Sequence, residues 1–197
     1  MSDGRLSEIN RKTRETDIQL RLNLDGTGSS RIATGVPFMD HMLSHVALHG
    51  LFDLDITCRG DTEVDDHHSV EDIGIALGQA LIAALGDKRG IVRYGQQLLP
   101  MDEALALVAV DISGRGLLAY DATLPSPRVG TFDTELVPEF LRALAHNAGL
   151  TLHVKLVYGS NTHHIIEAIY KGLGRALGQA VAPDPRRGAI PSTKGVL

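Results

Sequence analysis

The feature that most constrains this chain is a stretch of fifteen residues that occurs twice. The first copy covers 67–81 and reads HHSVEDIGIALGQAL, and the second covers 163–177 and reads HHIIEAIYKGLGRAL. Aligned at a separation of 96 residues, the copies are identical at eight of fifteen positions. Ile73, Leu77 and Leu81 recur every four residues, which is the spacing of a buried helix face. Each copy is therefore predicted to be a helix that begins with two histidines and carries a glutamate one turn later.

Both copies retain the same polar side chains at the helix start: His67, His68 and Glu71 in the first, and His163, His164 and Glu167 in the second. The first histidine and the glutamate share a helix face, whereas the second histidine points about 100° away. Two such helices facing each other could complete two metal sites. Each copy would give its first histidine and its glutamate to one ion, and its second histidine to the other. One histidine pair alone would favour a solvated helix start. Both copies retain the two histidines and the glutamate, and this favours a metal site, because imidazole and carboxylate are usual transition-metal ligands.

The remaining segments also follow one order in both halves. Patterning in the first half predicts strands at 16–24 and 31–34, a helix at 37–50, a strand at 51–58 and then the first repeated helix to about residue 86. The second half repeats this order with strands at 103–112 and 117–122, a helix at 134–147, a strand at 150–157 and the second repeated helix to about residue 182. We therefore expect an α+β fold of two duplicated β-β-α-β-α halves, each a sheet covered by helices.

The halves are expected at 1–92 and 93–182, joined by a linker at 87–90. A tail at 183–197 follows, which contains too much Pro and Gly for regular structure.

The first helices of the two halves align at a separation of 98 residues, which places His41 opposite Glu139. Either side chain could bind a metal. The alternative for Glu139 is an ordinary negative charge at a helix start, which the helix dipole favours. His45, one turn after His41, could instead contact a substrate.

Basic residues suggest an anion site. Arg115 lies between two glycines, and the segment 191–195 combines the hydroxyl of Ser192 with Lys194 and a permissive backbone. Such groups suit an anion such as phosphate. By composition alone, a disordered tail is an equal alternative.

Composition excludes several classes of protein. The net charge of −5 argues against nucleic acid as the main partner. No apolar run approaches the ~20 residues of a membrane span, and the N-terminus is polar without an apolar signal core. The single cysteine, Cys58, excludes an internal disulfide and fits a reducing cytoplasm.

Six motifs together, FMDHML, DDHHSVED, SGRG, HHIIEA, YKGLGRALGQAV and PSTKGVL, resemble the imidazoleglycerol-phosphate dehydratase family of histidine biosynthesis. The resemblance runs from about Arg11 to Leu197. It implies a duplicated fold of the ribosomal protein S5 domain 2-like type. It also implies two manganese ions (Mn²⁺) per active site and a homo-oligomer of 24 subunits with active sites at subunit interfaces.

The resemblance also implies roles for individual residues. The metal ligands it implies are His41, His67, His68, Glu71, His163, His164 and Glu167, with Glu139 at a position where histidine is expected in several relatives. The substrate contacts it implies are Glu15, Lys171, and Arg93, Arg115, Ser192 and Lys194 for the phosphate. His45 stands where relatives are expected to carry glutamine, which suits a substrate contact better than a ligand.

The implied reaction is the dehydration of D-erythro-imidazole-glycerol phosphate to imidazole-acetol phosphate. Two metals on the ring nitrogens would act as Lewis acids and as a template. A carboxylate near the substrate is the natural general base. Glu15 is our first candidate, with Glu71 or Glu167 if a ligand carboxylate shifts. A dinuclear metal-dependent phosphohydrolase is the competing enzyme class, and a metal-storage or metal-sensing protein is the non-enzymatic alternative.

Overall fold

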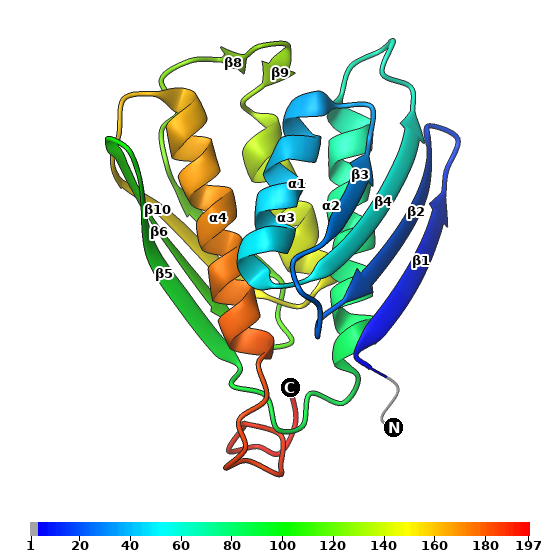
Figure 1. Ribbon diagram of the computed structural model, residues 1–197, viewed down its shortest axis with the longest axis vertical. Helices are drawn as coiled ribbons and strands as arrows, with labels where there is room; N and C mark the ends of the chain where they lie inside the picture. The colour runs from blue at the N-terminus through cyan, green and yellow to red at the C-terminus, as the bar shows by residue number, and fades with distance from the viewer. Residues whose placement is uncertain (1–3) are drawn as a thin grey trace.

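Two four-stranded sheets enclose a layer of four helices in the computed structural model, which describes residues 4–197 (Figure 1). The first sheet has the order β1-β2-β4-β3 and consists of β1 (Leu6–Lys12), β2 (Thr16–Asn23), β4 (Asp53–Gly60) and β3 (Ser30–Ala33). The second has the order β5-β6-β10-β7 and consists of β5 (Tyr94–Met101), β6 (Ala104–Asp111), β10 (Thr151–Tyr158) and β7 (Leu117–Asp121). The helices are α1 (Pro37–Gly50), α2 (His67–Leu85), α3 (Leu136–Asn147) and α4 (Thr162–Val181).

The two sheets have the same topology, which confirms the predicted duplication. In each, three strands pair antiparallel and the fourth, β3 or β7, pairs parallel with its neighbour. A short hairpin of β8 (Arg128–Val129) and β9 (Phe132–Asp133) interrupts the connection to α3 in the second half. The tail from Ala182 onward contains no helix or strand of the described chain, as its composition predicted.

Each four-stranded sheet contains one strand more than the sequence predicted, because the edge strands β1 and β5 were not recognised, and the β8–β9 hairpin was not predicted either. Both edge strands place a small residue beneath a helix instead of a large apolar one. Ser7 is buried and its hydroxyl donates to the carbonyl of Ala80 on α2 at 2.8 Å. Gly95 lies so close to α4 that a β-carbon on it would come within 1.8 Å of the Ala176 carbonyl oxygen. Their apolar alternation is therefore too weak to predict a strand.

The central strands follow the expected pattern, with Ile18, Leu20 and Leu22 of β2 buried against the helices. Leu54 and Ile56 of β4 face the same way. The helices themselves pair across the two halves, α1 with α4 and α2 with α3. The two repeated helices thus pack on the first helix of the opposite half, and the halves share one core. Across residues 4–197, no helix combines the length and apolar character that a membrane crossing requires.

Candidate metal centre

The repeated motifs begin α2 and α4 and lie at the same end of the helix layer, where all four helices have their N-termini (Figure 1). A side chain two residues earlier fixes each helix start: Asp65 accepts from the backbone N–H of His67, and Asn161 from those of His163 and His164. The paired histidine rings lie 6.3 and 6.2 Å apart in the two motifs, and both pairs cross at 82°. The second histidine of each motif therefore points away from the first.

Ligand atoms from both halves converge between α1 and α4. His41, His45 and Glu167 each offer one atom, and these atoms all lie within 4.8 Å of one another. The Nε2 atoms of His41 and His45 are 3.3 Å apart, and His163 Nε2 lies 3.1 Å from a carboxylate oxygen of Glu167. We call His41, His45, His163, Glu167 and Lys171 the α1–α4 cluster.

The electrostatics of the α1–α4 cluster keep a neutral imidazole beside an ionised carboxylate. Burial lowers the pKa of His45 to about 4, with Glu167 opposing and His41 and Lys171 reinforcing the shift. Burial alone would raise the pKa of Glu167, but the hydrogen bond from Lys171 and the neighbouring positive charges outweigh it, so this pKa is lowered. A neutral imidazole and a carboxylate are the forms that bind metal.

The α2–α3 side is the counterpart in the other half, and it differs chemically. Glu71 and Glu139 line one groove of about 170 Å³, together with Arg142 and His146. Arg142 holds Glu139 in an ion pair at 2.5 Å. Glu139 therefore lies next to a predicted ligand, but it already has a cationic partner one turn away.

His68 and His164 lie outside both groups and carry carboxylate partners of their own. Asp61 contacts Nδ1 of His68 at 3.0 Å, and Glu103 contacts Nδ1 of His164 at 2.7 Å. These hydrogen bonds raise the pKa of both histidines, and the contact with His164 lowers the pKa of Glu103 to about 2.

Glu15 lies in the turn between β1 and β2, with a carboxylate oxygen 3.8 Å from His68 Nε2. A buried network anchors this turn to α2: Thr16 and Arg11 both donate to the carboxylate of Asp72. Asp102 occupies the equivalent turn between β5 and β6, and lies 3.8 Å from His164 Nε2. The turn therefore brings the predicted base candidate beside a predicted ligand.

The predicted phosphate residues gather at the opposite end of the molecule. The backbone N–H of Arg93 donates to the carbonyl of Ala180 near the end of α4. The Arg93 side chain donates to Asp111 at 2.7 Å and to the Pro191 carbonyl at 2.8 Å, so it holds the tail in place. Gly114, beside Arg115, lies against the last residue, Leu197. Arg115 and Lys194 are exposed.

The sequence analysis did not identify four residues that flank the predicted ligands: Asp61, Asp102, Glu103 and Arg142. Each lies in a loop, a two-residue turn or on a helix surface, where isolated charges are common. Of these four, only Arg142 could have been found from the sequence, because it follows Glu139 by one helical turn, the spacing at which opposite charges on a helix pair.

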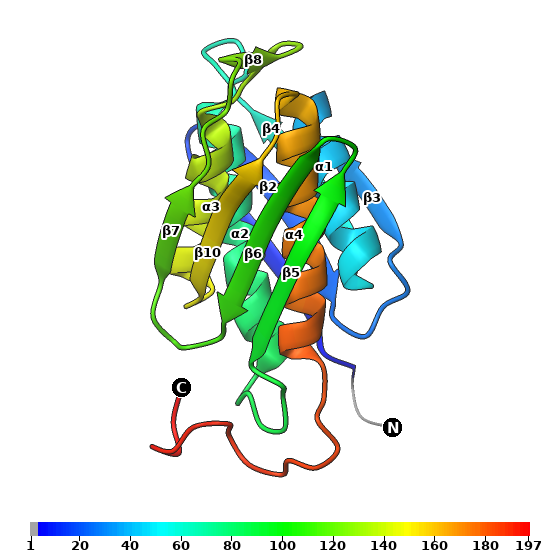
Figure 2. The same cartoon turned by 90° about the vertical axis from the view of Figure 1, so that its left-hand side faces the viewer.

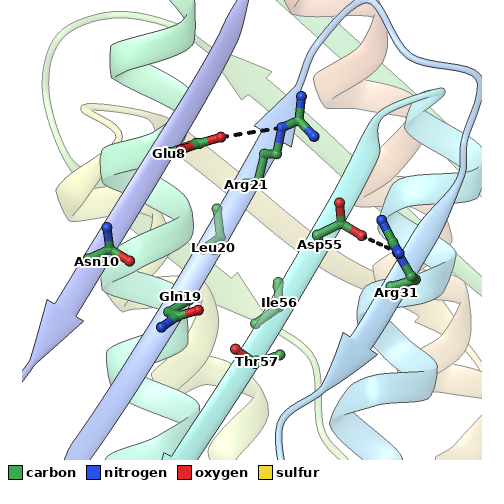
Figure 3. Close-up of a pocket in the computed structure, with 9 residues that line it drawn as sticks. All are labelled: Glu8, Asn10, Gln19, Leu20, Arg21, Arg31, Asp55, Ile56 and Thr57. Carbon is green, nitrogen blue, oxygen red and sulfur yellow. Dashed lines mark hydrogen bonds and ion pairs between the residues drawn. The ribbon is translucent and has the colours of Figure 1, made fainter.

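A hollow of about 430 Å³ lies on the outer face of the first sheet, away from the predicted ligands (Figure 3). Its charged side chains are paired, Arg21 with Glu8 and Arg31 with Asp55. These charged side chains neutralise one another and leave no unpaired charge among the described lining residues to bind a ligand, so we do not assign the hollow a role.

The fold and the cluster define a class: an α+β protein of two duplicated halves that brings together, between its helices, side chains that could hold a metal ion. The model of the family described as imidazoleglycerol-phosphate dehydratase matches residues 34–177. Proteins of that name from Desulforudis audaxviator and Methylobacterium radiotolerans are each 61% identical, over 98% of this chain and 98% and 100% of their own lengths.

Solved structures agree with the sequence relatives. The crystal structure of imidazoleglycerol-phosphate dehydratase from Staphylococcus aureus is 47% identical with a TM-score of 0.83, and covers 90% of this chain and 98% of its own. The structure from Pyrococcus furiosus, in complex with (S)-C348, is 39% identical with a TM-score of 0.84, and covers 96% and 100%. The chain belongs to the imidazoleglycerol-phosphate dehydratase family, and is therefore a hydro-lyase, a carbon–oxygen lyase, as predicted.

Proposed function

We propose that this chain converts D-erythro-imidazole-glycerol phosphate to imidazole-acetol phosphate and water in histidine biosynthesis. The relatives at about 60% identity over nearly the whole chain support this activity. The observation that carries the proposal is the α1–α4 cluster, in which His41 and His45 of the first half meet Glu167 of the second.

The donor set fits transition metals rather than Mg²⁺ or Ca²⁺. Imidazole nitrogens and carboxylate oxygens suit manganese, zinc or iron, and we propose two Mn²⁺ per active site. His41, His163 and Glu167 would hold one ion, and His67, Glu71 and Glu139 the other, each with a single histidine from a neighbouring subunit. When bound, the metals supply Lewis acidity to the imidazole ring of the substrate.

The protein's own side chains have distinct tasks in this proposal. Glu15 is the candidate base, because it is exposed in a turn that the Asp72 network holds beside His68. Glu71 and Glu167 are the alternative bases. His45 and Lys171 would contact the substrate one turn below the metals. Arg93, Arg115, Ser192 and Lys194 would bind the phosphate.

The position of these groups supports an active site shared between subunits. The metal-binding residues lie at the first turns of α4, and the phosphate-binding residues lie beyond its end. A helix of 20 residues is about 30 Å long, which is far more than a three-carbon chain can span. One chain cannot present both groups to one substrate, so another copy must supply the second. We propose the family's homo-oligomer of 24 subunits in the cytoplasm, where the buried free thiol of Cys58 would stay reduced.

The second sheet offers a surface for this assembly. Its outer face is uncovered in the described chain, as Figure 2 shows, and it carries Tyr94, Leu98 and Leu117 at 55%, 52% and 50% exposure. The outer face of the first sheet carries paired charges instead. Large apolar side chains exposed on an uncovered sheet face are a feature that protein interfaces often have.

One assay tests the proposed reaction. The Mn²⁺-loaded protein is incubated with imidazole-glycerol phosphate, and the keto product and free phosphate are measured in parallel. A keto product without phosphate release is expected. Phosphate release would instead indicate the phosphohydrolase, and neither product from metal-loaded protein would favour metal storage or sensing. Metal analysis after dialysis should give about two ions per subunit, and one or none would count against the paired sites.

A further inference from the structure

The two histidines that point away from the ligand groups share an arrangement that duplication does not explain. Asp61 lies in the loop between β4 and α2, and its carboxylate contacts Nδ1 of His68 through both oxygens, at 3.0 and 3.2 Å. Glu103 lies in the turn between β5 and β6, and contacts Nδ1 of His164 at 2.7 Å. Equivalent histidines therefore have the same partner group on the same ring nitrogen.

The two carboxylates come from different places in the repeat. Strands β4 and β10 correspond at a separation of 98 residues, so the counterpart of Asp61 is Gly159. Strands β2 and β6 correspond at a separation of 88 residues, so the counterpart of Glu103 is Glu15, which lies nearest Nε2 of His68 and not Nδ1. Neither carboxylate has a counterpart that makes the same contact in the other half. The same contact, made from unrelated positions, points to a requirement of the histidine itself.

A carboxylate on Nδ1 determines which ring nitrogen carries the proton. An ionised carboxylate only accepts, so Nδ1 must donate, and Nε2 of the neutral ring is left with a free electron pair. The Nε2 atoms lie 3.8 Å from the carboxylates of Glu15 and Asp102, beyond hydrogen-bond distance. The His68 and His164 side chains are 33% and 26% exposed, so Nε2 can reach a group outside the chain.

We propose that Asp61 and Glu103 are positioning residues that hold His68 and His164 ready to bind a metal ion carried by a neighbouring subunit. This inference rests on the proposed function, in which these histidines complete sites on other copies. A ligand that meets its metal only on assembly benefits from a ring that is already oriented. Carboxylates in this position raise the basicity of metal-binding histidine, and their loss commonly weakens metal affinity 10- to 100-fold.

Glu103 also shows why an amide cannot replace the carboxylate. One oxygen accepts from the backbone N–H groups of Ser160 and Asn161, at 3.2 and 2.7 Å, and the other accepts from His164. Glutamine has a single oxygen. In Glu103→Gln, that oxygen stays with the backbone and the amide NH₂ faces the ring, which moves the ring proton to Nε2.

The test compares Mn²⁺ binding in four proteins: wild type, Asp61→Asn, Glu103→Gln and the control Glu63→Gln. Glu63 is exposed in the same loop as Asp61, but carries no contact to His68 in the described structure. Free Mn²⁺ is followed by electron paramagnetic resonance in metal-depleted samples, and thermal unfolding of the metal-free proteins is recorded. We expect D61N and E103Q to bind Mn²⁺ roughly 10- to 100-fold more weakly with little change in metal-free Tm, and excess Mn²⁺ to restore turnover.

Two further variants separate positioning from folding. Asp61→Glu and Glu103→Asp keep the carboxylate and should recover most of the lost affinity. Wild-type affinity in D61N and E103Q would overturn the inference and leave the proposed function intact. A marked drop in metal-free Tm in both variants, alongside the loss of Mn²⁺ affinity, would also overturn it, because impaired folding would then explain the weaker binding. A wild-type protein that binds no Mn²⁺ would overturn the proposed function, and this inference with it.

Discussion

At the scale of single residues, the two motifs keep one geometry in two chemical settings. Beside Glu167, the neighbours are His45 and Lys171, and the carboxylate is ionised and flanked by positive charge. Beside Glu71, the corresponding groove contains a second carboxylate, Glu139, and Arg142. The duplicated protein therefore presents one imidazole-rich and one carboxylate-rich group.

The contact between Glu103 and His164 predicts a window of pH in which it stabilises the metal-free protein. The pKa of Glu103 is about 2, below its ordinary 4.5, so its contribution is present above pH 4.5 and lost as the pH falls towards 2. The pKa of His164 is raised above 6.5, so its contribution is complete below pH 6.5 and lost as the pH rises through the raised pKa. With chelator present, the Tm deficit of E103Q should be small, largest near pH 5.5, and should vanish towards pH 8.5, so the comparison of metal-free Tm values in the Mn²⁺-binding test is made at the higher pH. A deficit that grows with pH would contradict the assignment.

Arg115 and Lys194 should act on substrate affinity and not on metal binding. Loss of one charge-assisted contact to phosphate costs about 1.5–3 kcal/mol, or roughly ten- to a hundredfold in affinity. Arg115→Ala and Lys194→Ala should therefore raise KM by this factor while the metal content is unchanged. Arg186→Ala is the control, because this tail arginine is exposed and paired with Asp184. Unchanged KM in both variants would show that neither Arg115 nor the tail residue Lys194 binds phosphate.

Residue spacing placed each histidine beside a glutamate one turn along the same helix, but it did not predict the carboxylates that contact His68 and His164. Four-residue spacing on a helix is a local property, so His67 with Glu71 and His163 with Glu167 followed from the sequence. Glu103 reaches His164 across 61 positions, through a turn that only the tertiary structure places there. Such contacts leave no periodic signal.

At the scale of elements, the glycine that both motifs retain explains how the helices approach each other. A β-carbon on Gly174 would lie 2.7 Å from the Val46 carbonyl oxygen of α1, and one on Gly78 would lie 2.9 Å from the Leu144 carbonyl oxygen of α3. Each repeated helix therefore packs closely on its partner at this point. The duplication preserved a packing position as well as a metal motif.

Gly174→Ala should push α1 and α4 apart. Its β-carbon meets backbone atoms, which cannot rotate away, and overpacking of this kind costs about 1–3 kcal/mol. We expect a lower free energy of unfolding in urea and weaker Mn²⁺ binding, because the α1–α4 cluster spans the two helices. Gly188→Ala is the control, since nothing lies within 4 Å of its β-carbon position. Equal stability of G174A and wild type would show that the helices can separate without cost.

Element prediction succeeded where one face is apolar and failed at one edge of each sheet, the edge formed by β1 or β5. The helix at Pro37–Gly50 and the central strands were predicted nearly to their ends, because their buried faces are continuous. The edge strands β1 and β5 were not predicted, because Ser7 and Gly95 occupy inward positions where the helices come too close for larger side chains.

At the scale of the whole molecule, the proposed metal-binding residues and the proposed phosphate-binding residues lie at opposite ends of the folded chain. The residues that we propose to bind metal lie where the four helices begin, and those that we propose to bind phosphate lie beyond the end of α4, about 30 Å away (Figure 1). The sequence could not predict this separation, because it depends on the parallel alignment of the helices between the sheets. If both proposed groups act on one substrate, this separation makes assembly a condition of activity.

Complementation between two inactive variants tests this claim most directly. His163→Ala disables the metal-binding end, and the double variant Arg115→Ala, Lys194→Ala disables the phosphate-binding end. The two chains carry different tags, are co-expressed and are purified through both tags, so that every particle contains both. Each variant assembled alone serves as the baseline.

If sites are shared, some sites in the mixed particle combine an intact metal-binding end with an intact phosphate-binding end from different chains. We predict that dehydratase activity rises well above the sum of the two variants measured alone. Mixed particles with no activity beyond that sum would show that one chain supplies both ends of its own site, and would contradict the account.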